Sequence, residues 1–276
     1  MNIVQRNLFC LIRNSVFGQN NQVEPMSAYK WDKLQQLALM HDVAGYVYQG
    51  LQLSKDQFFL HLTDKQWTQW ETATNELSKK RFKNDEEPDE FLRADHLTNP
   101  VLNRILQNIL DDEQSDTHTR QLLLTIIRCS RHILNEGVPI RQLIEVGTYL
   151  RNDGRRADFV ALAQWLKKLR LQQVAKLEAS LLVLLFGFEK EEIPFAGDKI
   201  DKNVEQVAKE LIEFTNTRAK DFYFSQNANS IFVHSSNGNA MLSHVRRSAH
   251  YFRYCPSETL TNFFASFAHS LSHIEE

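Results

Sequence analysis

The sequence predicts an all-α protein, an irregular multi-helix bundle of about ten or eleven helices. Apolar residues recur at spacings of three and four along nearly the whole chain. Glycine and proline are scarce, with 9 and 6 residues, which argues against an all-β chain rich in tight turns. Hydrophobic residues make up 42% of the chain and charged residues 24%, a composition typical of a packed protein rather than a disordered one.

The N-terminal part shows the helical period in several stretches. A first helix is predicted within residues 3–15, and a second runs from a cap at Ser27 to a glycine at its end, residues 27–50. The apolar stripe of this second helix includes His41. The pattern continues through residues 58–62 and through a longer segment, residues 64–82.

An acidic stretch around Pro88 interrupts the helices over residues 84–99. Clustered acidic residues beside a proline indicate a solvated connection with little regular structure. We take it as the boundary between an N-terminal helical region, residues 1–83, and a C-terminal helical region, residues 100–276. The two regions form either two lobes or one continuous domain.

The helical period resumes at Pro100, which suits a first helical turn because its missing N–H costs nothing there. Residues 173–188 are apolar on most sides, which predicts a central helix. Residues 225–239 are predicted as a loop, and the last helix is expected to have Ser257 as its N-cap and Glu258 in its first turn. The predicted helical segments are 101–110, 119–137, 139–150, 156–171, 173–188, 203–224, 241–254 and 257–274.

Familiar catalytic and metal-binding spacings are absent from the sequence: it has no P-loop, GxGxxG, GxSxG, HExxH or EF-hand pattern. His269 and His273 share a helical face, but no further ligand type at matching spacing accompanies them, so we predict no metal and no cofactor. Three widely spaced cysteines are predicted to be free thiols in the core. They are Cys10, Cys129 and Cys255.

Charge and hydropathy limit the compartment and the partners. The chain has 32 Lys and Arg against 34 Asp and Glu, a balance that favours neither nucleic acid nor an anionic membrane. The longest apolar block, residues 181–186, is too short to span a bilayer, and no signal peptide is expected. We therefore expect a cytoplasmic protein that binds a protein partner or a small anionic ligand, with its oligomeric state open.

The stretch from His132 through Gly137 to Leu143 resembles a motif of a bacterial family described as uncharacterised nucleotidyltransferases. In that family a helix ends in His and Gly and the next begins with a Gly-Leu-Arg-Gln-type sequence; the Arg-Gln pair and the acid that follows it correspond to Arg141, Gln142 and Glu145. The sequences HDVAGYVYQGL and RYCPSETL are also similar to family sequences. The resemblance implies nucleotidyl transfer on an α/β core inserted before Pro100, with paired aspartates holding a metal.

The chain departs from that family where the catalytic core belongs, because residues 83–99 are too few to form a metal-binding sheet. The resemblance therefore implies a non-catalytic helical binding or scaffold protein, for which we predict binding residues but no catalytic ones. The predicted binding residues are Arg141, Gln142, Glu145 and Arg151.

Two alternatives remain open. One is an active nucleotidyltransferase with a site rebuilt around Asp111, Asp112 or Asp198. The other is a module that self-associates through phenylalanines near its end. These phenylalanines are Phe263, Phe264 and Phe267.

Overall fold

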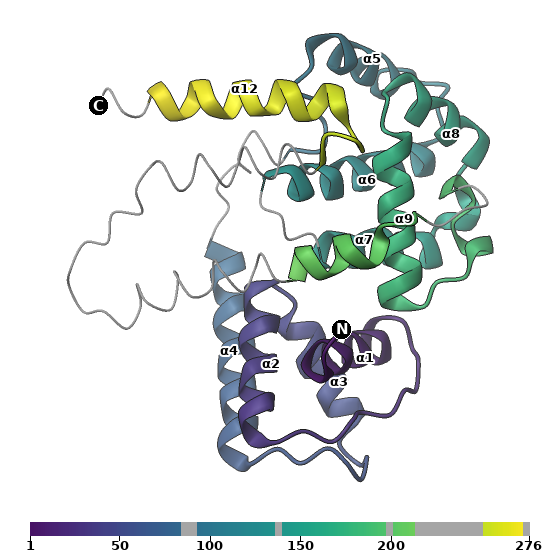
Figure 1. Cartoon of the computed structure of the whole chain (residues 1–276). Helices are drawn as coiled ribbons and strands as arrows, with labels where there is room; N and C mark the ends of the chain where they lie inside the picture. Colours follow the sequence, from purple (N-terminus) through teal and green to yellow (C-terminus); the bar gives the residue numbers. More distant parts are fainter. Residues whose placement is uncertain (84–92, 136–139, 197–200, 213–250, 273–276) are drawn as a thin grey trace.

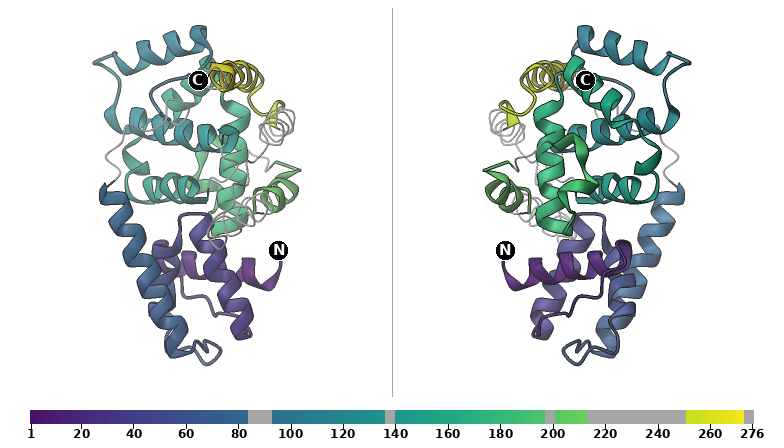
Figure 2. Two further views of the ribbon diagram at one scale, coloured as in Figure 1. Left: turned by 90° about the vertical axis from the view of Figure 1, so that its left-hand side faces the viewer. Right: turned by 90° about the vertical axis from the view of Figure 1, so that its right-hand side faces the viewer.

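The part of the chain that the structure describes consists of helices joined by turns and short connections. The computed structural model describes residues 1–83, 93–135, 140–196, 201–212 and 251–272, and no β-strand occurs among them. The predicted all-α class is therefore confirmed. Figure 1 and the two side views of Figure 2 show two tiers, with the helices of residues 1–83 at one end of the molecule.

Four helices form the N-terminal tier: α1 (Ile3–Val16), α2 (Ala28–Met40), α3 (Ala44–Leu53) and α4 (Asp64–Lys83). A capping box begins α1, because the side chain of Asn2 accepts from the Gln5 N–H and that of Gln5 accepts from the Asn2 N–H. At Gly50, α3 lies so close to α1 that an added Cβ would overlap the carbonyl group of Leu11. This glycine therefore allows the two helices to pack tightly against each other.

The prediction of one helix over residues 27–50 is wrong, because the chain breaks between α2 and α3. Asp42 has a φ of +53°, and the Val43 N–H donates to the Ala38 carbonyl at 2.9 Å. Aspartate tolerates this left-handed conformation better than most residues, so the helix ends without a glycine or proline. The predicted helical pattern over 58–62 is also wrong: these residues are turn and extended chain, and Phe58 is exposed.

The second tier contains six helices with bounds given by the structure. Pro100 and Asp158 act at helix starts: the proline occupies the first turn of its helix, and the aspartate side chain accepts from two N–H groups of the next turn. The helices are α5 (Pro100–Leu110), α6 (Thr117–Asn135), α7 (Ile140–Asn152), α8 (Phe159–Lys168), α9 (Gln172–Phe186) and α12 (Pro256–Ser272).

Short 3₁₀ turns and one further helical segment also belong to this tier. Residues 204–212 are helical, while residues 213–250, which include the predicted loop over 225–239, lie outside the described residues. The 3₁₀ turns are η2 (Gly154–Arg156), η3 (Lys190–Glu192) and η4 (Pro194–Ala196).

The central position predicted for the apolar helix is confirmed. Helix α9 packs against α1, α6, α7 and α8, and most of its side chains are buried. Its buried Glu178 accepts a hydrogen bond from the Ser130 hydroxyl at 2.8 Å. Burial raises the pKa of this carboxyl well above its usual range, because the charged form would lose its hydration.

A buried ion pair fixes the start of α12. Arg131 Nη1 lies 2.8 Å from Glu258 Oε1, and both side chains are almost completely buried. The same carboxylate accepts from the backbone N–H groups of Thr98 and Asn99 at 2.7 and 3.2 Å, just before α5. Glu258 thus lies in the first turn, as predicted, but the prediction of Ser257 as N-cap is wrong because α12 already begins at Pro256.

Aromatic rings join the two tiers. Phe17 follows α1, and its ring centroid lies 5.4 Å from the ring centroid of Phe186 and 5.1 Å from that of Phe188. Gly147 on α7 leaves room for them, because a Cβ there would lie within about 3 Å of both Phe17 and Phe188. The two tiers therefore share a continuous apolar core.

Candidate functional site

The predicted binding residues lie on α7, and each contacts another part of the chain. Arg141 pairs with the carboxylate of Asp42 and lies 3.3 Å from Glu145, while Gln142 lies 3.3 Å from the ring of His132. Arg141 and Glu145 thus lie together, at the junction between α7 and the turn before α3. Binding of a ligand by these residues stays a prediction.

Arg151 lies farther along α7 and belongs to a different set of contacts. Its guanidinium pairs with Glu192 at 2.9 Å, donates to the Phe17 carbonyl at 3.3 Å and stacks on the rings of Phe17 and Phe188. The structure therefore does not bring Arg151 together with Arg141, and it places this arginine at the joint between the tiers.

The aspartates of the alternative catalytic site do not form a cluster in the described residues. Asp112 accepts from the Gln114 N–H and the Ser115 hydroxyl within its own turn, next to Asp111. Asp198 lies outside the described residues. No group of three or more potential metal ligands occurs among the residues that the structure describes.

Several residues that the sequence analysis singled out lie wholly or partly outside the described residues. The side chain of His269 and all of His273 are not described, so their pairing stays a prediction. Phe264 is exposed on α12 and Phe263 is half-buried, while the side chain of Phe267 is not described. The three cysteines are buried and free, as predicted.

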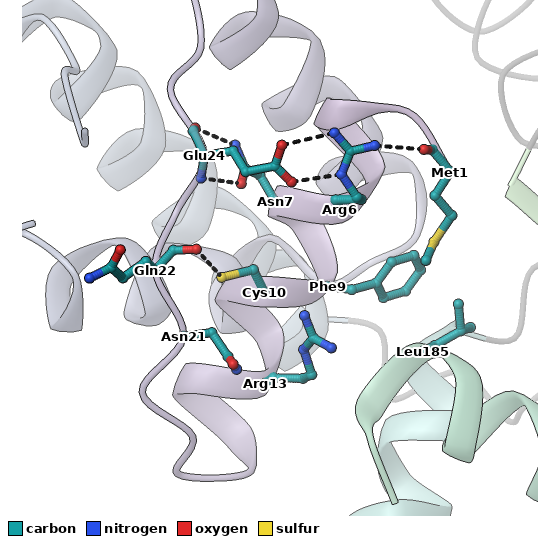
Figure 3. A pocket seen from close by; sticks show the side chains of 10 residues that line it. All are labelled: Met1, Arg6, Asn7, Phe9, Cys10, Arg13, Asn21, Gln22, Glu24 and Leu185. Carbon is teal, nitrogen blue, oxygen red and sulfur yellow. Dashed lines mark hydrogen bonds and ion pairs between the residues drawn. The ribbon is translucent and has the colours of Figure 1, made fainter.

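A cavity that sequence analysis did not find lies along α1, beside the extended segment 21–24. Two asparagine side chains on α1 hold this segment by its backbone, and Figure 3 shows the first of them, Asn7. Asn7 accepts from the Glu24 N–H and donates to the Glu24 carbonyl, at 2.9 and 2.8 Å. Asn14 makes the same pair of bonds with Asn21, at 2.9 Å each, so the segment runs antiparallel to the helix.

The cavity has a volume of about 340 Å³ and is lined by Met1, α1, segment 21–24 and one residue of α9. We call it the α1 cavity. Its walls combine polar and apolar side chains, and the buried ones include Phe9, Cys10 and Leu185. The residues that line it are Met1, Arg6, Asn7, Phe9, Cys10, Arg13, Asn21, Gln22, Glu24 and Leu185.

The two arginines of the α1 cavity differ in their partners. Arg6 makes a bidentate pair with Glu24, at 2.6 and 2.8 Å, and the guanidinium lowers the pKa of that carboxyl. Arg13 has no hydrogen-bond or ion-pair partner for its side chain among the described residues, and its Nε is buried. Figure 3 shows its guanidinium between Cys10 and Leu185.

The charges of the residues that line the α1 cavity favour a negatively charged ligand. Burial raises the pKa of the Cys10 thiol, and the charge of Arg13 opposes that rise. The thiol donates to the Gln22 carbonyl at 3.5 Å and is thus a neutral part of the wall. An arginine with a buried donor and no counter-charge is a ready site for a carboxylate or a phosphoryl group.

A repeat in the sequence could have indicated this cavity. The dipeptide Arg-Asn occurs at Arg6-Asn7 and again seven residues later at Arg13-Asn14, which places both copies on one face of α1. Each asparagine holds one end of the same segment. Arg6 pairs with Glu24 at one end of the segment. At the other end, next to Arg13, the residue held by Asn14 is Asn21, which carries no charge.

Comparison with family models, with curated proteins and with solved structures gives no match for this chain. In the described residues, no helix is both long enough and apolar enough to cross a membrane.

Proposed function

We propose that this chain is a non-catalytic helical binding protein whose ligand is a small anion held in the α1 cavity by Arg13. One observation carries the proposal: of the two arginines in the cavity, Arg6 is neutralised by Glu24, whereas Arg13 has no side-chain partner among the described residues. The sequence resemblance to nucleotidyltransferases, together with an interval too short for their catalytic core, is the further support for binding rather than nucleotidyl transfer.

Energetics support a negatively charged ligand. Leaving a buried donor of a charged group without an acceptor costs about 1–3 kcal/mol or more, and an anion at Arg13 would recover that cost. The volume of about 340 Å³ lies at the small end of the range for ligand pockets. The segment opposite is fixed by Asn7 and Asn14, so little of the site needs ordering when a ligand enters.

The test is an NMR titration of the ¹⁵N-labelled chain at low ionic strength, with sodium acetate and with sodium phosphate. We expect saturable shifts at the amides around Arg13 and Asn21 with at least one of them. Arg13→Gln should weaken binding about tenfold or more. The exposed Arg104→Gln, which removes the same charge from α5, should leave the affinity unchanged within about twofold.

Two results would contradict the proposal. One is the absence of saturable shifts at the α1 cavity with either anion. The other is tight binding of a nucleoside triphosphate with Mg²⁺ together with turnover, measured by calorimetry, which would favour the rebuilt catalytic site instead.

A further inference from the structure

We infer that α12 carries a self-association surface, and that a second copy of this chain packs its own α12 against it. The surface is an apolar stripe that begins with Leu260 and Phe264 and that the sequence continues at Phe267 and Leu271. Three observations lead to it: the way α12 is attached to its tier, the spacing of the stripe and the absence of charge along it. The inference does not depend on the α1 cavity.

Polar contacts attach the first two turns of α12 to the second tier. Glu258 and Asn262 lie on the attached side and are 1% and 4% exposed. Glu258 forms the buried ion pair with Arg131 of α6. The side-chain amide of Asn262 donates to the side chain of Asn135, also on α6, at 2.9 Å. These contacts fix which side of α12 faces its own tier.

Apolar side chains lie on the opposite side of the same two turns. Residues two positions apart are separated by about 200° around an α-helix, so Leu260 and Phe264 point away from the attached side. Both are exposed, at 49% and 59%, and Figure 1 shows α12 extending from the second tier toward the C-terminus. Because α12 buries polar groups and exposes apolar ones, its outer side has the character of an association surface.

The spacing of the stripe is that of a seam between two helices. Leu260, Phe264, Phe267 and Leu271 follow one another at intervals of four, three and four residues, which is the a and d spacing of a coiled coil. All four positions lie within the bounds of α12. Such a seam packs against another helix with the same spacing, and a second α12 supplies one.

The absence of charge favours an identical partner. Between Thr259 and Ser272 the sequence has no Lys, Arg, Asp or Glu, although charged residues make up 24% of the chain. A symmetric pair buries the same patch of both copies, so charges of one sign beside the seam would repel each other, whereas different partners are usually matched by opposite charges there. Two phenylalanines and two leucines from each copy would bury on the order of 1,000 Å², about the lower limit for a specific interface.

The test is size-exclusion chromatography with light scattering on the full chain, from about 1 to about 100 μM, because association depends on concentration. The mass of the wild type should rise toward twice the 32.2 kDa of one chain. Phe264→Glu, which puts a charge into the seam, should raise the dissociation constant about a hundredfold or more. Phe264→Leu keeps the seam apolar and should stay within about tenfold of the wild type. The matched control is Val160→Glu, at an exposed apolar position on α8, which should leave the dimer unchanged.

A second exposed position keeps the test independent of any one variant. Thermal melts followed by circular dichroism check folding, and if Phe264→Glu fails to fold, Leu260→Glu should dissociate the dimer instead. A wild type that is monomeric at every concentration overturns the inference; if Phe264→Glu then also lowers the melting temperature, the stripe packs within its own chain. A dimer that survives both glutamate substitutions overturns it as well, because the contact then lies elsewhere.

Discussion

At the scale of single residues, His41 shows what burial does to a titratable side chain. Its ring is buried at the end of α2, and neither ring nitrogen has a hydrogen-bond partner in the part of the chain that the structure describes. Burial lowers the pKa of this imidazole from 6.5 to about 3, because the protonated ring would lose its hydration without gaining a counter-charge. The imidazole of His41 is therefore neutral in the folded chain at neutral pH.

This shift predicts a loss of stability in acid. Between about pH 6.5 and pH 3, His41 is protonated in the unfolded chain and neutral in the folded chain. The contribution of His41 is thus fully present above pH 6.5, and it falls by up to about 1.4 kcal/mol per pH unit below that. Urea unfolding at pH 7, 6, 5 and 4 should show a shallower decline for His41→Leu than for the wild type.

The control for this pH profile is the exposed His61→Leu, which should decline in parallel with the wild type. Equal slopes for wild type and His41→Leu would show that the ring at position 41 takes up its proton in the folded state.

At the scale of elements, two helices of the second tier end on a left-handed residue, and only one of them uses glycine. Gly187 follows α9 with a φ of +68°, where glycine has no steric penalty. After α8 the equivalent position is Arg170, with a φ of +57°, and Leu171 N–H closes the turn on the Leu166 carbonyl at 2.8 Å. Arginine pays a backbone cost there, because its Cβ approaches the carbonyl oxygen.

Exchanging residues at these two helix ends should change stability in opposite directions. Arg170→Gly should stabilise the chain by about 0.5–1 kcal/mol, because glycine adopts the left-handed conformation without a steric penalty. The substitution loses only one exposed hydrogen bond of 3.4 Å, from Arg170 to Ser257. Gly187→Ala should destabilise it by about 1 kcal/mol, although its nearest neighbour, Gln19, leaves room for a methyl group. Thermal and urea unfolding measure both; a loss of stability in Arg170→Gly would contradict the backbone argument.

At the scale of the whole molecule, the joint between the tiers depends on Arg151. This side chain stacks on Phe17 and Phe188, pairs with Glu192 and donates to a carbonyl of the N-terminal tier. A cation between two aromatic rings and a carboxylate at a half-buried position stabilises more than an exposed pair does. The arginine predicted as a binding residue thus has a position that holds the two halves together.

Arg151→Met tests this role, because methionine keeps much of the apolar contact and removes the charge and the donors. We expect a loss of about 1–2 kcal/mol in the free energy of unfolding. The exposed Arg155→Met, one turn away, should change it by less than about 0.5 kcal/mol. Equal effects of the two substitutions would mean that Arg151 contributes no more than a surface arginine.

Local patterns predict the helices well because the apolar period records which face of each helix is buried. They also identify α9 as the central helix and the cysteines as core residues. They miss the break at Asp42, because no glycine or proline marks it and an aspartate supplies the left-handed turn. They also miss the α1 cavity, because its far wall comes from Leu185, distant in sequence from the arginines that it faces.

The amino-acid sequence is enough to predict the helical class of this chain, most of its helices and the absence of familiar catalytic motifs, since these depend on neighbours within a few residues. The folded structure, in contrast, was needed to show that Arg6 is neutralised, that Arg151 joins the tiers and that Arg13 has no counter-charge among the described residues. The physical reason is that the partner of a charge is whatever lies within a few ångströms in space. Two identical Arg-Asn pairs therefore acquire different surroundings once the chain folds.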